Sequence, residues 1–142
     1  MLTAANAIIT LSQATLFPTP QQLQGFAADE VTDMDNAKVL EHVMGVDGKL
    51  SFGFVFVERM QNITLQADSA SNSFFDTINQ YQEAGETAYP LTGVIILPAI
   101  GLMFNCTNGG LDTYNPMPPV RKIIQPRKYR LVWNRVVARP NS

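Results

Sequence analysis

Residues 50–85 constrain the fold more than any other stretch, because two strand patterns are followed directly by a helix pattern. From 50 to 56 every second residue is leucine or phenylalanine, so these side chains share one face of a strand. A second alternating run covers 60–67. The spacing then becomes helical over 73–84, with an apolar stripe of Phe74, Phe75, Ile78 and Tyr81. We expect a sheet whose aromatic face forms the core beneath this helix, which Gly85 ends.

The dipeptide Asp47-Gly48 predicts a hairpin that joins a strand over 38–46 to the aromatic strand beginning at residue 49. Two-residue type I′ turns need a positive φ at both central residues, and Asp-Gly is one of the sequences that provide it.

The rest of the chain is also mainly β in pattern. Strand-like runs cover 7–11, 21–28, 38–46, 91–97, 100–106, 120–124 and 128–137. We expect Phe17-Pro18-Thr19-Pro20 and Pro98 to interrupt strands, and Asn108-Gly109-Gly110 to turn the chain. The length of 142 residues fits one domain, residues 1–142, with an extended N-terminal segment (1–20) and a Pro/Gly-rich loop (108–119).

Charge is sparse and unevenly distributed. The formal net charge of −2 argues against a protein that binds nucleic acid by neutralising phosphates. Residues 1–68 carry a balance of −5 and residues 69–142 a balance of +3. Such a division is typical either of a solvated surface or of copies that stack head to tail.

The sequence holds no recognisable catalytic or metal-binding group. His42 and Cys106 are the only residues of their kinds, so the usual zinc ligands are too few. The acidic stretch 29–36 lacks the calcium-loop spacing. No glycine motif for phosphate follows Gly110. We therefore predict no catalytic residue, no cofactor and no metal. A basic segment over 121–130 fits a charged interface or solvated face better than a phosphate site.

Two further observations concern location. The longest apolar run, 91–104, is interrupted by Pro98 and Gly101 and is shorter than the ~20 residues of a membrane helix. The N-terminus lacks the basic segment of a signal peptide. We expect a protein made in the cytoplasm, with no membrane partner.

The order of these elements resembles that of bacteriophage tail tube proteins and is similar to the inner-tube subunits of contractile tails. The resemblance covers most of residues 20–137. It includes the long hairpin, the polar strand that enters the helix at Ser-Asn-Ser-Phe-Phe-Asp (71–76), and the final aromatic-basic strand Tyr-Arg-Leu-Val-Trp (129–133). Residues 65–75 are its most specific part.

The resemblance implies an antiparallel β-sandwich or half-barrel with one flanking α-helix. Six copies would form a ring whose inner strands complete a β-barrel, and rings would stack into a hollow tube in the virion tail. This conduit would pass DNA without specific binding during genome delivery. The expected partners are further copies of the chain and sheath, baseplate and terminator proteins. Polar positions Asn62, Thr64 and Gln66 share one strand face and are the expected lumen-facing residues.

For contacts between rings we expect an acidic loop to meet a basic segment. The residues concerned are Asp29, Glu30, Asp33 and Asp35, and Arg121, Lys122, Arg127, Lys128 and Arg130. One alternative is another ring-forming virion part, such as a tail terminator or baseplate protein. From a different class, a small-ligand β-barrel carrier would be a monomer with an enclosed apolar cavity. An enzyme ranks last, because the sequence offers no cluster of acid, base and nucleophile.

Overall fold

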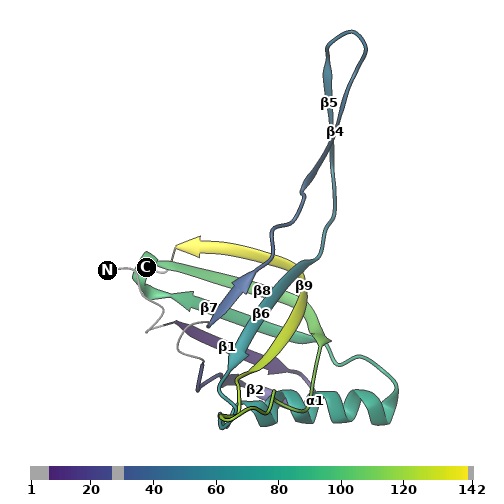
Figure 1. Ribbon diagram of the computed structural model, residues 1–142. Helices are drawn as coiled ribbons and strands as arrows, with labels where there is room; N and C mark the ends of the chain where they lie inside the picture. Colours follow the sequence, from purple (N-terminus) through teal and green to yellow (C-terminus); the bar gives the residue numbers. More distant parts are fainter. Residues whose placement is uncertain (1–6, 27–30, 141–142) are drawn as a thin grey trace.

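The computed structural model describes residues 7–26 and 31–140, and its main feature is one antiparallel sheet of seven strands (Figure 1). The strands lie in the order β2-β1-β7-β8-β9-β6-β3. Their bounds are β1 Ile8–Gln13, β2 Phe17–Gln22, β3 Thr32–Met34, β6 Arg59–Leu65, β7 Leu91–Leu97, β8 Leu102–Thr113 and β9 Arg127–Pro140. The sheet is open, because β2 and β3 lie at opposite edges. The predicted mainly β, antiparallel fold of the half-barrel type with one flanking helix is confirmed.

Helix α1, Asn72–Gly85, lies across one face of this sheet (Figure 1). Its buried stripe contains Phe74, Phe75 and Ile78, as its spacing predicted. Phe75 stacks on Tyr129 of β9 with ring centroids 4.2 Å apart. Tyr81, the last residue of the stripe, is 48% exposed, and its ring contacts Tyr89 with the centroids 6.2 Å apart. The backbone leaves the helix at Glu86, which adopts the left-handed conformation, rather than at Gly85.

A buried asparagine fixes the passage from β6 into the helix. The Nδ2 group of Asn72 donates to the carbonyls of Gln66 and Ala67, at 3.0 and 3.2 Å. Its Oδ1 accepts a hydrogen bond of 2.8 Å from the Tyr129 hydroxyl. Both polar atoms of the Asn72 side chain are thereby paired, which explains why an amide can occupy a buried position.

The core extends along β9, where Tyr129, Leu131 and Trp133 are at most 2% exposed. The prediction that Asn108-Gly109-Gly110 turns the chain was wrong, because β8 continues through it to Thr113. Gly109 lies beneath the Trp133 indole, where an added Cβ would be 2.1 Å from the Trp133 Cε3 atom. The glycine therefore serves close packing within a strand.

The predicted hairpin is present as β4, Leu40–Met44, paired with β5, Leu50–Phe54. Its turn is longer than the predicted type I′, because Gly45 N–H donates to the Lys49 carbonyl and Gly48 alone has a positive φ, of 85°. The two strands form a separate sheet that projects away from the body (Figure 1). The prediction that the aromatic face of β5 forms the core beneath α1 was therefore wrong.

Proline placement explains another difference. The segment with Pro18 and Pro20, predicted to interrupt strands, belongs to strand β2. β2 is an edge strand, so one row of its N–H groups has no partner strand, and proline is tolerated there. The run 21–28 is not a strand of its own: Leu23 is buried and Phe26 forms an isolated bridge with Leu65. The run 120–124 contains only a bridge between its ends. Pro98 does end β7, and a short 3-10 turn, Pro98–Ile100, follows.

Candidate functional site

The projecting hairpin is the most unusual surface of the protein. Its two strands, its turn and the residues that flank them expose large apolar side chains: Val39, Leu40, Val43, Met44, Val46, Leu50, Phe52, Phe54 and Phe56. Phe52, Phe54 and Phe56 are 64%, 72% and 93% exposed. An isolated two-stranded hairpin is marginally stable in water, and an exposed apolar patch of this kind marks an interaction site. We refer to residues 38–56 as the hairpin arm.

The arm is a continuation of the β3–β6 ribbon beyond the rest of the sheet. Asp35 N–H donates to the Met60 carbonyl at 2.9 Å, just past the last pair of β3 and β6. Further out, Val55 N–H donates to the Val39 carbonyl at 3.2 Å. These two bonds continue the antiparallel pairing outward from the start of β6 to the base of the arm.

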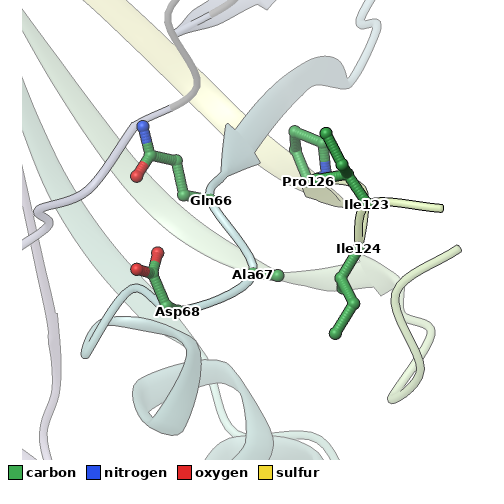
Figure 2. Close-up of a pocket in the computed structure, with 6 residues that line it drawn as sticks. All are labelled: Gln66, Ala67, Asp68, Ile123, Ile124 and Pro126. Carbon is green, nitrogen blue, oxygen red and sulfur yellow. The ribbon is translucent and has the colours of Figure 1, made fainter. Parts of the chain in front are cut away.

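A second apolar surface lies at the other end of β6. A groove of about 480 Å³ lies there. Figure 2 shows the residues that line it, which come from the segment after β6 and from the loop before β9: Gln66, Ala67, Asp68, Ile123, Ile124 and Pro126. Ile123 and Ile124 are 74% and 55% exposed. We call residues 114–126 the groove loop. A backbone hydrogen bond of 2.9 Å from Gln125 N–H to the Pro119 carbonyl holds its far part together.

An ion pair anchors the groove loop to the helix. The Arg127 guanidinium donates to both carboxylate oxygens of Asp76, from Nη2 at 2.9 Å and from Nη1 at 3.3 Å. It also donates to the Asn115 carbonyl at 3.1 Å, and the Tyr114 hydroxyl donates to Asp76. The guanidinium lies 5.1 Å from the centre of the Tyr129 ring. Both ends of the loop are thereby fixed to α1 and β9.

This anchor changes the acidity of the groups in it. Hydrogen bonding from Arg127 lowers the pKa of the Asp76 carboxyl below its ordinary value, against the opposing effect of burial. Burial raises the pKa of the Tyr129 hydroxyl. Sequence reasoning did not single out Asp76. The local pattern of a helix does not indicate which distant basic residue will pair with an acidic side chain on it.

The predicted charged contacts are partly used within the chain. Asn62 Nδ2 donates to Asp33 at 2.7 Å and to Asp35 at 3.0 Å. Asp35 also pairs with Arg130, with 3.4 Å between Oδ2 and Nη2. Arg130 Nε in turn donates to Asn62 Oδ1 at 3.0 Å. This network joins β3, β6 and β9, and its members lie opposite one another in the strand register.

The other charged candidates lie in different places. Arg127 is buried in the anchor, whereas Arg121, Lys122 and Lys128 are exposed. Asp29 and Glu30 lie outside the described residues. Contacts between copies stay a prediction for this set.

The three candidates for a lumen also differ in exposure. Asn62 and Thr64 lie on the sheet face turned away from α1, opposite Arg130 and Lys128 in the register. Asn62 is half-buried, Thr64 is 7% exposed, and Gln66 lies past the end of β6 on the groove. The strand β9 therefore brings two cations beside these positions, which the local sequence 49–67 did not indicate.

Among the described residues, no catalytic arrangement surrounds the single histidine or the single cysteine. His42 lies on the exposed arm. Cys106 is buried, and burial raises the pKa of its thiol to about 11. Within residues 7–26 and 31–140, no group of three His, Cys, Asp or Glu side chains is placed to hold a metal ion. Over the same residues, neither helical segment combines the length and apolar character needed to cross a bilayer.

Comparison with known proteins gives one family match. The model of the family described as "Tail fiber protein gp32" matches residues 2–137. No curated protein matches the chain.

Two solved structures share the fold. A chain of the extended-state sheath–tube complex of PVC, an extracellular contractile injection system, is 10% identical, with a TM-score of 0.59 over 99% of this chain and 92% of that one. A chain of the anti-feeding prophage baseplate is 8% identical, with a TM-score of 0.54 over 96% of this chain and 93% of that one.

Proposed function

The chain belongs to the tail fiber protein gp32 family, which makes it a phage tail-related protein, and we propose that it is a subunit of the tail tube. In this proposal six copies form a ring, and stacked rings form the hollow conduit through which the genome is delivered into the host cell. The role is structural and not enzymatic. Sheath proteins would contact the outside of the tube, and baseplate and terminator proteins would contact its ends.

One observation supports this proposal above the others: the single chain leaves its apolar surface and its sheet edges incomplete. The hairpin arm exposes Phe52, Phe54 and Phe56, and the rings of Phe54 and Phe56 contact each other edge to face. The open sheet ends in β2 on one side and in β3 on the other. Closure through neighbouring copies removes unpaired edges, which otherwise promote uncontrolled association. A monomeric β-barrel carrier needs a closed barrel, whereas this sheet is open.

The sheet face turned away from α1 is the candidate lumen surface. Asn62 lies on it with the largely buried Thr64, and the Arg130 charge there is balanced by Asp35, while the exposed Lys128 lies opposite Thr64. A neutralised cation does not hold phosphates strongly, because binding to nucleic acid depends on the release of counterions by unpaired positive charge. Such a face fits a conduit better than a binding site for DNA.

Charged contacts between rings are part of the same proposal. The exposed acids Asp33 and Asp35 of one ring would meet Arg121 and Lys122 of the next, with Asp35 shared between this contact and Arg130 of its own chain. Arg127 is left out of this set, because its guanidinium is buried with Asp76. Asp29 and Glu30 would extend the acidic side.

Electron microscopy of negatively stained protein tests the proposal. We expect rings and short filaments with a central channel, growing in number with protein concentration. A molecule that remains a monomer at high concentration, measured by light scattering, would contradict it. Replacing both Asp33 and Asp35 with lysine should shorten the filaments, more strongly at low salt because screening weakens exposed charge pairs. The matched control replaces both with asparagine, which removes the acids without reversing charge and should have a smaller effect.

A second candidate is a baseplate or terminator protein that forms a single ring. The observation in its favour is the fold shared with a baseplate chain over 96% of the present chain. The same micrographs separate the two candidates, because a single-ring protein gives rings without filaments at every concentration.

A further inference from the structure

We propose that the hairpin arm of one copy docks on the groove loop of another copy, so that the groove between β6 and the loop is its acceptor site. This inference rests on the proposed function, because it names the contact by which copies in successive rings would meet. One chain has two exposed apolar surfaces, the arm and the groove, and no described residue of the same chain packs over either of them.

The two surfaces lie at opposite ends of the same strand. The arm leads into Arg59, the first residue of β6, whereas Gln66, Ala67 and Asp68 of the groove follow its last residue, Leu65. Seven residues of strand span roughly 23 Å, so an arm that projects outward cannot fold back into the groove of its own chain (Figure 1). A different copy can reach it. Two unlike surfaces at opposite ends give a head-to-tail contact, which repeats along an axis and does not close after two molecules.

The chemistry of the two surfaces is complementary. The outer half of the arm offers Val43, Met44 and Val46, which are 69%, 62% and 111% exposed. The groove offers the exposed side chains of Ile123 and Ile124 (Figure 2). Apolar side chains on both partners allow the contact to exclude water, which is the main source of stability in such an interface.

Charges at the rims of the two surfaces are also complementary. The turn of the arm carries Asp47, and the groove loop carries Arg121 and Lys122 with no acidic residue, so in this docking the two bases meet Asp47 in place of Asp33 and Asp35. Glu41 is already paired with Lys38 inside the arm, at 3.4 Å. With the signs reversed, the basic Lys49 of the arm can pair with the acidic Asp68 of the groove. Complementary rims set orientation and select the correct partner more than they add affinity.

The groove loop is already fixed by contacts within its own chain. The Asp76–Arg127 pair and the Asn115 carbonyl fix one side of it, and the Gln125–Pro119 hydrogen bond fixes the other. A surface that is already ordered does not lose conformational entropy on docking, so more of the apolar contact appears as binding free energy.

Disulfide trapping tests this inference. The variant carries Val46→Cys on the arm and Ile123→Cys in the groove, with Cys106→Ala to remove the native thiol. Under mild oxidation of the assembled protein we expect a ladder of dimers, trimers and longer chains on a non-reducing gel. An equimolar mixture of the two single-cysteine proteins, Val46→Cys and Ile123→Cys, should stop at dimers, because each molecule then supplies one half of the contact.

The outcomes separate this inference from the tube proposal. Assembly of the parent Cys106→Ala protein is followed by electron microscopy. If the double-cysteine variant assembles as the parent does but gives no ladder, the arm does not dock on this groove, and the tube proposal still stands. Cross-linking of Val46→Cys to itself would show a symmetric contact between two arms and would likewise overturn the inference. A parent that never assembles would contradict the tube proposal itself.

A folded control removes one further ambiguity. Ile123→Glu introduces a charge at an exposed position, so the far-ultraviolet circular dichroism and the urea midpoint should match those of the parent. We expect this variant to lose filaments. Filaments of unchanged length and number would overturn the assignment of the groove.

Discussion

The two aromatic strands of the protein, β5 and β9, share an alternating pattern of large apolar side chains but lie in opposite environments. Both place large side chains at every second position, Phe52 and Phe54 in one and Tyr129, Leu131 and Trp133 in the other. The β9 residues are at most 2% exposed, whereas the β5 phenylalanines are more than half exposed. Alternation predicts a strand and the face that its side chains share. It does not say what covers that face.

The difference comes from the neighbours of each strand. β9 lies in the interior of the sheet between β8 and β6, beneath α1. β5 pairs only with β4 and extends past the end of the sheet. The body of the protein is thus stabilised by contacts within the chain, whereas the apolar side chains of the arm remain exposed in the single chain.

The largest expected effect on stability comes from Phe75→Ala in the body. Phe75 is fully buried against Tyr129, so its removal leaves a cavity and should lower the free energy of unfolding by ~3–5 kcal/mol. Urea denaturation followed by circular dichroism measures this change. A loss below about 1 kcal/mol would show that the helix does not seal the core as described.

Gly109→Ala should have the next largest effect. The added methyl group would overlap the Trp133 ring and the Val132 carbonyl, and we expect a loss of about 1–3 kcal/mol in the free energy of unfolding. The adjacent Gly110 is the matched control, because nothing lies within 4 Å of a Cβ built there. Equal urea midpoints for the two variants would refute the close packing of Gly109 on Trp133.

Asp76→Asn tests the anchor of the groove loop. The change removes the charged acceptor of Arg127, and because Asp76 is 44% exposed and partly screened, we expect a loss of only ~1–2 kcal/mol. Asp112→Asn is the control, since that exposed acid lines the same side of the helix without contacting Arg127 in the described structure. Urea titrations at neutral pH compare the two.

The anchor also predicts a dependence on pH. The folded state lowers the pKa of Asp76, so the contribution of this carboxylate is fully present above the unfolded value of about 3.9. It is lost as the pH falls through the lower folded pKa. The stability difference between the wild type and Asp76→Asn should therefore shrink between about pH 5 and pH 2. A constant difference over this range would contradict an ionised Asp76 in the anchor.

The smallest expected effect on folding comes from Phe54→Ser in the arm. Because the side chain is 72% exposed in the single chain, the free energy of unfolding of the protomer should change by no more than about 0.5 kcal/mol. Assembly, however, should be strongly reduced. Phe75→Ala and Phe54→Ser together give the sharpest comparison. Phe75→Ala should lower the urea midpoint, whereas Phe54→Ser should reduce the number of filaments in micrographs. The reverse pattern would show that the two strands have been assigned the wrong roles.

Some elements of the fold are specified by short-range chemistry and were predictable. Asp47-Gly48 indicated the hairpin, and the spacing of Phe74, Phe75 and Ile78 indicated both the helix and its buried face. The continuous apolar run of β7 and its end at Pro98 followed from the side chains alone. These features depend on residues that are close to one another in the sequence, so the spacing of residue types is enough to predict them.

Other features depend on partners far away in the chain and were not predictable. Gly109 acts within a strand because the Trp133 indole, 24 residues later, lies on it. Arg127 is buried because Asp76 meets it across 51 positions. The segment with Pro18 and Pro20 is a strand because it lies at an edge of the sheet. None of these relations has a local pattern.

The amino-acid sequence by itself determined a mainly β protein with one amphipathic helix, a long hairpin and no evident catalytic group. Only the tertiary structure decided that the aromatic hairpin stands outside the core and that the groove loop is fixed at the far end of β6. The physical reason is that burial depends on which surfaces meet in three dimensions. Periodicity orients a side chain within its own strand or helix, and the assembled sheet and helix determine whether water remains beside it.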